Sequence, residues 1–379
     1  MSSIHRIMRA SAVAVGVAAL AAFAIVPAAQ AGTNSSFIGP FTHNDTITTT
    51  VPANGDVNPY GVAVVPTSTG SLVKGDVLVS NFNNSANAQG TGTTIVQVSP
   101  GGGQPTVFAQ IDASKLPGPC PGGVGLTTAL GILPGGWVVV GSLPTKDGTS
   151  ATARAGCLLV ISNKGQVAET IAGHGINGPW DMATVSAGPL AALFVSNVLN
   201  GTVAANGATV NRGTVERLTL LLRGSKPPLL VAHTIVGSGF GERTDPAALV
   251  VGPTGLGLDS HGTLFVADSV GNRITAIPAA LVRSNSAGTG NMVTKRGKLN
   301  TPLGLAIAPN GDVLTVNAGD GLIVETTPGG KQVASFLLDN SVTPPSPPGA
   351  GALFGLAVTP NANGVYYVDD AANTLNLFH

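Results

Sequence analysis

Short runs of apolar residues, separated by glycine, proline, asparagine or aspartate, recur along most of this chain. The run 303–308 reads LGLAIA, with almost no polar residue between the apolar ones, which is typical of a strand buried on both faces. The turn 309–311, Pro-Asn-Gly, follows it, and a second apolar run covers 313–316. Asparagine and glycine in such a turn supply the positive φ angles of a tight hairpin. The pattern therefore predicts short antiparallel strands.

This strand, turn and strand form an internal repeat. Its clearest copies span 252–277, 301–324 and 353–377, and looser copies begin at Pro59, Thr127 and Pro179. One position near the start of the first strand aligns in all copies, and it is occupied by Gly61, Ala129, Asp181, Gly255, Gly304 and Gly355. The spacings of about 50 to 75 residues are near or above the periods of propeller blades. The repeat predicts an all-β, six-bladed β-propeller.

Composition supports the all-β fold class. Charged residues make up 9% of the chain and hydrophobic residues 43%, and 52 of the 379 residues are glycine. A chain with few Lys, Glu and Arg and many turn formers suits short strands better than amphipathic helices. Lys plus Arg and Asp plus Glu are both 18, so no net field attracts nucleic acid or an anionic membrane surface. We expect no nucleic-acid partner.

The N-terminus has the three parts of a secretory signal peptide. Basic residues at Arg6 and Arg9 precede an apolar run over 12–26, and the Ala-Gln-Ala sequence at 29–31 predicts cleavage after Ala31. The apolar run is shorter than a membrane-spanning helix needs, and no later stretch is long and apolar enough to span. We expect a signal peptide over 1–31, a single propeller over 32–379, and export to the periplasm or the extracellular space.

The two cysteines, Cys120 and Cys157, fit an exported protein. Disulfides persist outside the cytoplasm, and an even number of cysteines leaves no spare thiol. We expect a Cys120–Cys157 disulfide that connects a loop before the inner strand of blade 2 to the third strand of the same blade. A zinc site is the weaker alternative, because two sulfurs supply half of the usual ligands.

The repeat resembles the NHL repeat. That repeat combines a Pro-x-Gly-apolar start, an Asp-x-x-Gly turn and a Val-Ala-Asp-Ser-x-x-Asn-Arg-Ile segment, and 252–277 matches it almost throughout. The match is good at 301–324 and 353–377 and degenerate in the first three copies. The resemblance implies a six-bladed propeller over nearly the whole mature chain.

The two ends of the chain are expected to meet. The last copy supplies about three strands before the chain ends, and the segment 37–51 belongs to no copy. We expect this segment to add the outer strand of the last blade, which leaves no long free sheet edge. Insertions between strands predict loops, which we place at 101–123, 146–156, 201–212 and 343–348.

Two rings of side chains are expected near one mouth of the central channel, because the first strands begin and the second strands end at the same face. The first ring contains Tyr60, Thr128, Trp180, Thr254, Leu303 and Phe354. The second contains Asn81, Ser142, Asn197, Asp268, Asn317 and Asp369. Asparagine and aspartate at such positions bond to backbone amides of the following turn, so we interpret the second ring as structural.

The first ring is the candidate ligand site. Tyr60, Trp180 and Phe354 concentrate aromatic side chains in a chain that is only 4% aromatic, and Asp181 places a carboxylate beside them. A partly apolar, partly wet pocket at the channel mouth is one interpretation. Packing that plugs the channel is the alternative.

Metal-dependent catalysis is the competing interpretation of the axis. Distantly similar gluconolactonase-like propellers hold a divalent metal with Glu, Asn and Asp side chains, but this chain lacks the Pro-Asn-Gly starts that would supply the Asn ligands. Asp181, Asp268 and Asp369 remain weak candidates to bind Ca or Zn. The mature chain also has five histidines without close metal-ligand spacing, at positions 43, 174, 233, 261 and 379.

Two functional hypotheses therefore remain. The first is a non-catalytic exported propeller that binds a protein, peptide or glycan, and it rests on the lack of a convincing catalytic set. The alternative is a divergent metal-dependent, lactonase-like hydrolase or lyase with its site on the channel axis. No GxSxG motif or P-loop indicates a standard serine hydrolase or an NTPase.

Overall fold

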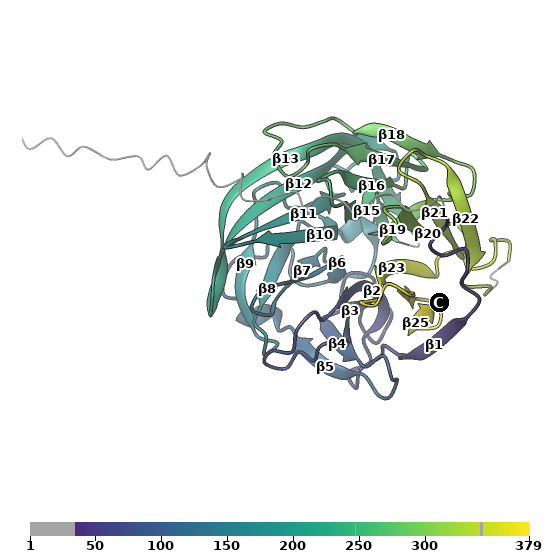
Figure 1. Ribbon diagram of the computed structural model, residues 1–379. Coiled ribbons are helices and arrows are strands. Elements are labelled where there is room, and N and C mark those ends of the chain that lie inside the picture. Colours follow the sequence, from purple (N-terminus) through teal and green to yellow (C-terminus); the bar gives the residue numbers. More distant parts are fainter. Residues whose placement is uncertain (1–34, 247, 342–343) are drawn as a thin grey trace, which may run out of the picture.

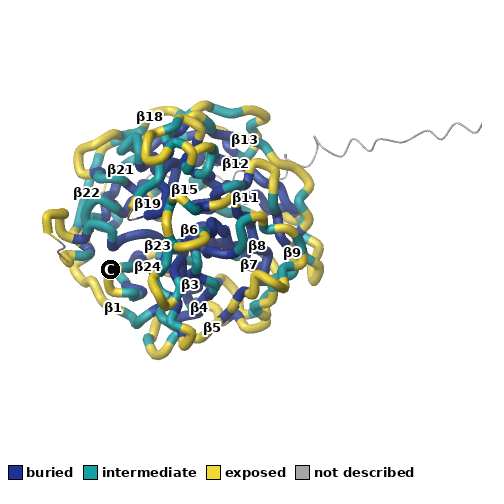
Figure 2. The backbone as a smooth tube through the Cα atoms, turned by 180° about the vertical axis from the view of Figure 1, so that it is seen from behind, coloured by how far each residue is buried: buried dark blue, intermediate teal, exposed yellow. Residues whose placement is uncertain are grey.

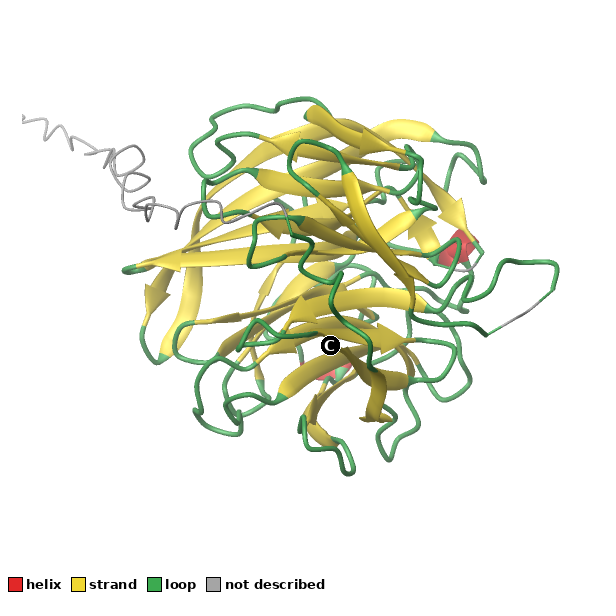
Figure 3. Ribbon diagram, turned by 45° about the vertical axis from the view of Figure 1, so that its right-hand side comes forward, coloured by secondary structure: helices red, strands yellow, loops and turns green. Residues whose placement is uncertain are grey.

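Six antiparallel sheets surround a common axis (Figure 1). The computed structural model describes residues 35–246, 248–341 and 344–379. Within these residues the helical elements are two short 3-10 turns, η2 (Ala113–Lys115) and η3 (Ser150–Thr152), and strands form nearly all the rest of the regular structure (Figure 3). The prediction of an all-β, six-bladed propeller is confirmed. The expected signal peptide lies outside the described residues.

The first three blades cover residues 57–251. Blade 1 consists of β2 (Val57–Val64), β3 (Val77–Asn83), β4 (Thr94–Val98) and β5 (Thr106–Gln110). Blade 2 consists of β6 (Leu126–Leu133), β7 (Trp137–Ser142), β8 (Cys157–Ile161) and β9 (Val167–Ile171). Blade 3 has five strands, β10 (Pro179–Ala187), β11 (Leu190–Asn197), β12 (Val210–Arg223), β13 (Lys226–Asp245) and β14 (Leu249–Val251).

The last three blades are more regular. Blade 4 consists of β15 (Pro253–Leu258), β16 (Leu264–Asp268), β17 (Arg273–Ile277) and β18 (Asn291–Lys295). Blade 5 consists of β19 (Pro302–Ile307), β20 (Val313–Asn317), β21 (Leu322–Thr326) and β22 (Gln332–Leu337). Blade 6 consists of β23 (Leu353–Val358), β24 (Val365–Asp369), β25 (Thr374–Phe378) and the N-terminal strand β1 (Asn44–Thr49).

The ring closes as expected, because β1 pairs with β25 as the outer strand of blade 6. Reciprocal backbone hydrogen bonds of 2.9 Å join His43 and His379 next to this pair. Upstream, the Glu325 carboxylate on blade 5 accepts hydrogen bonds from the backbone amides of Phe37 and Ile38, at 2.7 and 2.9 Å. Both contacts hold the N-terminal segment against the last two blades.

The aligned position of the repeat is small because the inner strands of neighbouring blades approach closely. A Cβ atom on Gly304 would lie 1.9 Å from the carbonyl oxygen of Phe354 in the next blade, and one on Gly355 would lie 2.1 Å from that of Tyr60. In blade 4, two residues after the aligned Gly255, a Cβ atom on Gly257 would lie 2.3 Å from the Leu305 side chain. These distances are far below ordinary contact, so larger side chains would force the blades apart.

Burial differs between the strands of a blade and is most complete in the second strand. Second strands such as β3, β7 and β16 are buried along their whole length, whereas the outer strands are partly exposed. Figure 2 shows the buried strands in dark blue and the exposed connections in yellow. The continuous apolar runs in the sequence arise because these strands have a neighbouring blade on each face.

The polar residues at the ends of the second strands stabilise the backbone around them. Asp268 accepts a 2.9 Å hydrogen bond from the amide of Gly271, and Asp369 accepts one of 3.0 Å from Ala372, both in the following turn. Asn81 and Asn317 instead donate to carbonyl oxygens of Thr50 and Lys298, in the segments that lead into their own blades. These contacts support the structural interpretation of the second ring.

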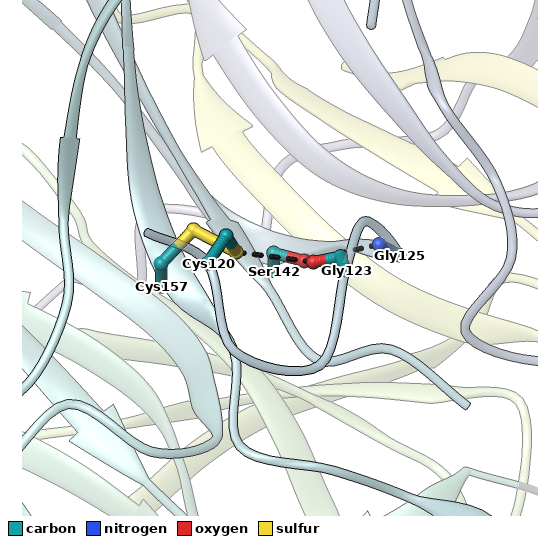
Figure 4. The surroundings of a disulfide bond; sticks show 5 residues. All are labelled: Cys120, Gly123, Gly125, Ser142 and Cys157. Atoms are coloured by element: carbon teal, nitrogen blue, oxygen red, sulfur yellow. Dashed lines mark hydrogen bonds between the residues drawn. A yellow bond between two sulfur atoms is a disulfide. The ribbon is translucent and has the colours of Figure 1, made fainter. Parts of the chain in front are cut away.

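The predicted disulfide is present and joins Cys120 to Cys157, with Cα atoms 5.1 Å apart (Figure 4). Cys157 begins β8, the third strand of blade 2, and Cys120 lies in the loop before β6. The loop is also held by Ser142, whose hydroxyl donates to the carbonyl oxygen of Gly123 and accepts from the amide of Gly125. The bond thus fixes this loop to its own blade.

Two expectations about loops are wrong. The insertion 101–123 contains β5, the outer strand of blade 1, and 201–212 already includes the start of β12. Blade 3 also gains a fifth strand, β14, which pairs with the end of β13 through Arg243↔Val251. In the part of the chain described here, no helix is long and apolar enough to cross a membrane.

Candidate functional site on the propeller axis

An aromatic stack closes the axis at the end where the first strands begin. The ring of Tyr60 stacks on Phe354 and on Phe82, with centroids 4.0 and 4.4 Å apart, and Trp180 lies 6.2 Å from Tyr60. All four side chains are buried, at 3% exposure or less. Their burial raises the pKa of the Tyr60 hydroxyl well above its ordinary value.

Strand β14 covers this stack. The indole Nε1 of Trp180 donates a 3.0 Å hydrogen bond to the carbonyl oxygen of Val250, and residues 248–251 are buried. The space left between the rings and this strand is about 10 Å³. The structure thus brings Tyr60, Trp180 and Phe354 together, but a ligand could contact them only if β14 moved. Ligand binding at these rings stays a prediction.

A second cavity, of about 50 Å³, lies on the axis beneath the aromatic stack and is partly open. Its walls come from the residue after each aligned position, namely Val62, Leu130, Met182, Leu256, Leu305 and Leu356. Thr128 and Asp181 are its polar wall residues. The Thr128 hydroxyl oxygen is buried and finds no hydrogen-bond partner among the described residues. This volume suits one or two water-sized groups.

Asp181 is the acidic group of this axial cavity. Its Oδ2 atom accepts a 2.9 Å hydrogen bond from the amide of Leu256 in blade 4. Its own amide donates to the Ser196 hydroxyl at 3.0 Å, and that hydroxyl donates to the carbonyl oxygen of Thr254 at 2.8 Å. The carboxylate therefore fills the close approach between blades 3 and 4 where other blades carry Gly or Ala, and backbone contacts fix its position.

Burial raises the pKa of Asp181 to about 7, because an apolar wall disfavours the charged form. The hydrogen bonds from the backbone amides of Leu256 and Met182 oppose this shift only in part. A carboxyl group with a pKa near neutrality can accept or donate a proton at physiological pH. The candidate ligand-binding Asp181 thus has the properties of an acid–base group.

The three candidate metal ligands do not form one site. Asp268 forms an ion pair with Arg273, with 2.6 Å between Oδ2 and Nε. Asp369, at the end of β24 in blade 6, lies near Asp339, and burial raises the pKa of Asp369 to about 7. Asp181 is bound to blade 4 at the axis. Across the described residues, no group of three or more His, Cys, Asp or Glu side chains is placed to hold a metal ion. The axial residues do not fit a calcium or zinc centre.

Sequence reasoning missed the opposite end of the axis. The first strands finish there in half-buried, mostly aliphatic side chains, which are Val64, Ile132, Thr184, Leu258, Ile307 and Val358. Ile307 also lines a groove of about 730 Å³ between blades 4 and 5, and Ile132 and Thr184 line one of about 690 Å³. Each of these residues lies three positions after the aligned position of its repeat copy, so the repeat contained a signal for this ring.

Comparison with known proteins places the fold among lactonase-like propellers. A gluconolactonase from Xanthomonas campestris is 12% identical with a TM-score of 0.51, each chain being covered to 86%. A luciferin-regenerating enzyme is 11% identical with a TM-score of 0.53, covering 86% of this chain and 92% of its own. The calcium-binding protein regucalcin from Agrobacterium tumefaciens is 12% identical with a TM-score of 0.52, covering 88% of this chain and 94% of its own.

No family model matches the sequence, and no curated protein matches it significantly. The hypothesis of a non-catalytic binding scaffold is nevertheless wrong as the leading interpretation, because similar solved structures include a gluconolactonase and a luciferin-regenerating enzyme. At 11 to 12% identity the likeness itself establishes the fold.

Proposed function

We propose that this protein is a hydrolase of small esters or lactones, with Asp181 as its general acid–base group. The observation that carries the proposal is the position of Asp181. Five of the six blades have Gly or Ala at the aligned position, and only blade 3 has a titratable side chain there. That side chain reaches the axial cavity, where burial raises its pKa to about 7.

The residues that line the axial cavity can carry out the proposed hydrolysis. The ionised Asp181 carboxylate takes a proton from a water molecule in the axial cavity, and the water oxygen attacks the carbonyl carbon of the substrate. When the carbon–oxygen bond of the ester breaks, the protonated Asp181 returns the proton to the leaving alkoxide. The Thr128 hydroxyl, which lines the same cavity, is available to hold the water or the carbonyl oxygen.

The size and lining of the site restrict the substrate. A cavity of about 50 Å³ admits water and a reacting carbonyl group, but not a whole substrate. The remaining part of the substrate lies toward the half-buried aliphatic ring at the open end, which favours a small, mainly apolar ester or lactone. Because the axial residues do not fit a metal centre, no step of this proposal passes through one. We also propose that the repeat is of the NHL type and that the N-terminal segment directs export of the protein.

The test uses a panel of small aliphatic and aromatic esters and lactones, assayed with purified protein. Asp181→Asn keeps the shape of the side chain and an oxygen for the Leu256 amide, so we expect it to fold and to lose at least about 100-fold in kcat. Asp370→Asn is the matched control, because burial also raises the pKa of Asp370 to about 7 while its side chain does not line the axial cavity. Equal activity of Asp181→Asn and wild type would refute the proposal.

A further inference from the structure

The structure brings together two histidines that are 59 positions apart in the sequence. His174 lies in the connection between β9 and β10, and His233 lies in β13, the fourth strand of blade 3. Their imidazole rings are 5.0 Å apart between centroids, at an angle of 61°. Both side chains are at the surface, and that of His233 is 49% exposed. A solute can therefore reach both rings.

A buried carboxylate fixes the orientation of one of these rings. Glu216 lies on β12, where it pairs with Ile235 of β13, two residues from His233. Its side chain is completely buried, and its Oε1 lies 2.9 Å from Nδ1 of His233. This contact places the proton on Nδ1 and leaves Nε2 of His233 free to act as a ligand. Carboxylate, histidine and metal follow in this order in many metal sites, where the carboxylate raises the basicity of the ligand.

The loop that carries His174 is fixed as well. Gly173 and Ile176 form an isolated bridge, with the amide of Ile176 donating to the Gly173 carbonyl at 2.8 Å, and Ile176 is buried. His174 has a φ angle of 52°, a conformation that few residues other than glycine adopt. Gly175 has a φ angle of 82°, which favours glycine, and a Cβ atom there would lie 2.6 Å from Oε2 of Glu216, so the loop packs closely on this carboxylate.

The spacing of the two rings fits a shared metal ion. Zinc binds imidazole nitrogen at about 2.0 to 2.1 Å in tetrahedral geometry, which places the centroids of two ligand rings about 5 Å apart. The observed separation is 5.0 Å. Imidazole donors select zinc, copper or nickel and not calcium or magnesium. Two protein ligands are also consistent with the lack of any three-residue cluster in the described part of the chain.

We propose that His174 and His233 bind one divalent transition-metal ion, with Glu216 as the positioning residue for His233 and water in the remaining coordination positions. The site lies on the outer part of blade 3, away from the axial cavity, and is independent of the proposed hydrolase site. It connects the loop before blade 3 to β13 of that blade. The metal would therefore stabilise the contact between blades 2 and 3.

The test is a zinc titration of tag-free full-length protein by isothermal calorimetry, after removal of metal with a chelator. We expect one zinc per chain, an increase in melting temperature with zinc, and no effect of calcium. His174→Ala and His233→Ala should each weaken zinc binding at least about tenfold, and Glu216→Gln should weaken it by about 10- to 100-fold. His261→Ala, which removes another exposed histidine, is the matched control and should bind zinc normally.

Two results would overturn this proposal. One is the absence of zinc binding to wild-type protein at millimolar zinc. The other is wild-type zinc affinity in both His174→Ala and His233→Ala. Because His233→Ala also removes the contact of Nδ1 with the buried Glu216 carboxylate, circular dichroism checks that each variant is folded. Zinc binding should survive in Asp181→Asn, so failure of the metal site and failure of the hydrolase proposal are distinguishable.

Discussion

Blades 4 to 6 form a regular half of the molecule, and blades 1 to 3 form an irregular half. In the regular half every aligned position is glycine, and each blade has four strands. The irregular half contains the disulfide, Ala129 and Asp181 at aligned positions, the fifth strand β14, and the pair His174 and His233. Thus the groups with special chemistry lie where the repeat is degenerate.

This difference has a physical explanation. A blade that follows the repeat satisfies the geometry of the propeller by small residues and turns alone, so its sequence has little freedom at the axis. A blade that departs from the repeat needs other contacts, such as the disulfide in blade 2 or the Asp181 to Leu256 hydrogen bond in blade 3. Functional groups can occupy the positions that these contacts support.

The disulfide is expected to make the largest contribution to stability. Replacing Cys120 and Cys157 with serine releases a loop with a sequence separation of 37, which in the chain-entropy model costs about 3 to 4 kcal/mol. The midpoint of urea unfolding should therefore fall. Wild type measured with reductant should unfold at the same midpoint as the double variant. An unchanged midpoint in both would show that the irregular blade does not depend on this bond.

The glycines of the regular half are expected to be indispensable. Gly304→Ala places a methyl group 1.9 Å from the Phe354 carbonyl oxygen and should lower the free energy of unfolding by about 3 kcal/mol. Ala129→Gly, the matched change at the same position of blade 2, should cost only about 1 kcal/mol. Both changes in the free energy of unfolding are to be measured by urea unfolding. Equal costs would show that the close approach of inner strands does not differ between the two halves.

The stability of blade 3 should depend on pH through Asp181. The folded pKa of about 7 exceeds the ordinary 3.8, so the folded state holds a proton that the unfolded state releases, and stability falls as pH rises from about 4 to 7. Asp181→Asn removes this penalty. The variant should be more stable than wild type at pH 8 and about equally stable at pH 4. A gain of the same size at both pH values would contradict the assigned cause.

Much of the fold was predictable from the sequence, because glycine at the aligned position and the turn after each inner strand follow directly from the geometry of a blade. Closure by β1 was predictable because blade 6 lacked a strand. Strands β5 and β14 were missed, since short outer or capping strands depend on tertiary contacts and lack a clear local pattern.

The site was predictable only in part. Asp181 stood out because it replaces a small residue in a repeat. Its raised pKa could not be read from the sequence, because it depends on apolar side chains from all six blades. Tyr60, Trp180 and Phe354 were correctly placed near one another, but no pattern in the sequence indicated strand β14, which covers them. The pair His174 and His233 was hidden because their proximity arises from packing between a loop and an outer strand.

The most direct test of the proposed role of Asp181 is the pH dependence of kcat/KM for ester or lactone hydrolysis. We predict that the rate rises with pH and levels off above an inflection near pH 7, because Asp181 must lose its proton to act as a base. In Asp181→Asn the residual rate should lack this inflection, whereas Asp370→Asn should retain it. An inflection near pH 7 that persists unchanged in Asp181→Asn would contradict the assignment of Asp181 as the acid–base group of an axial site.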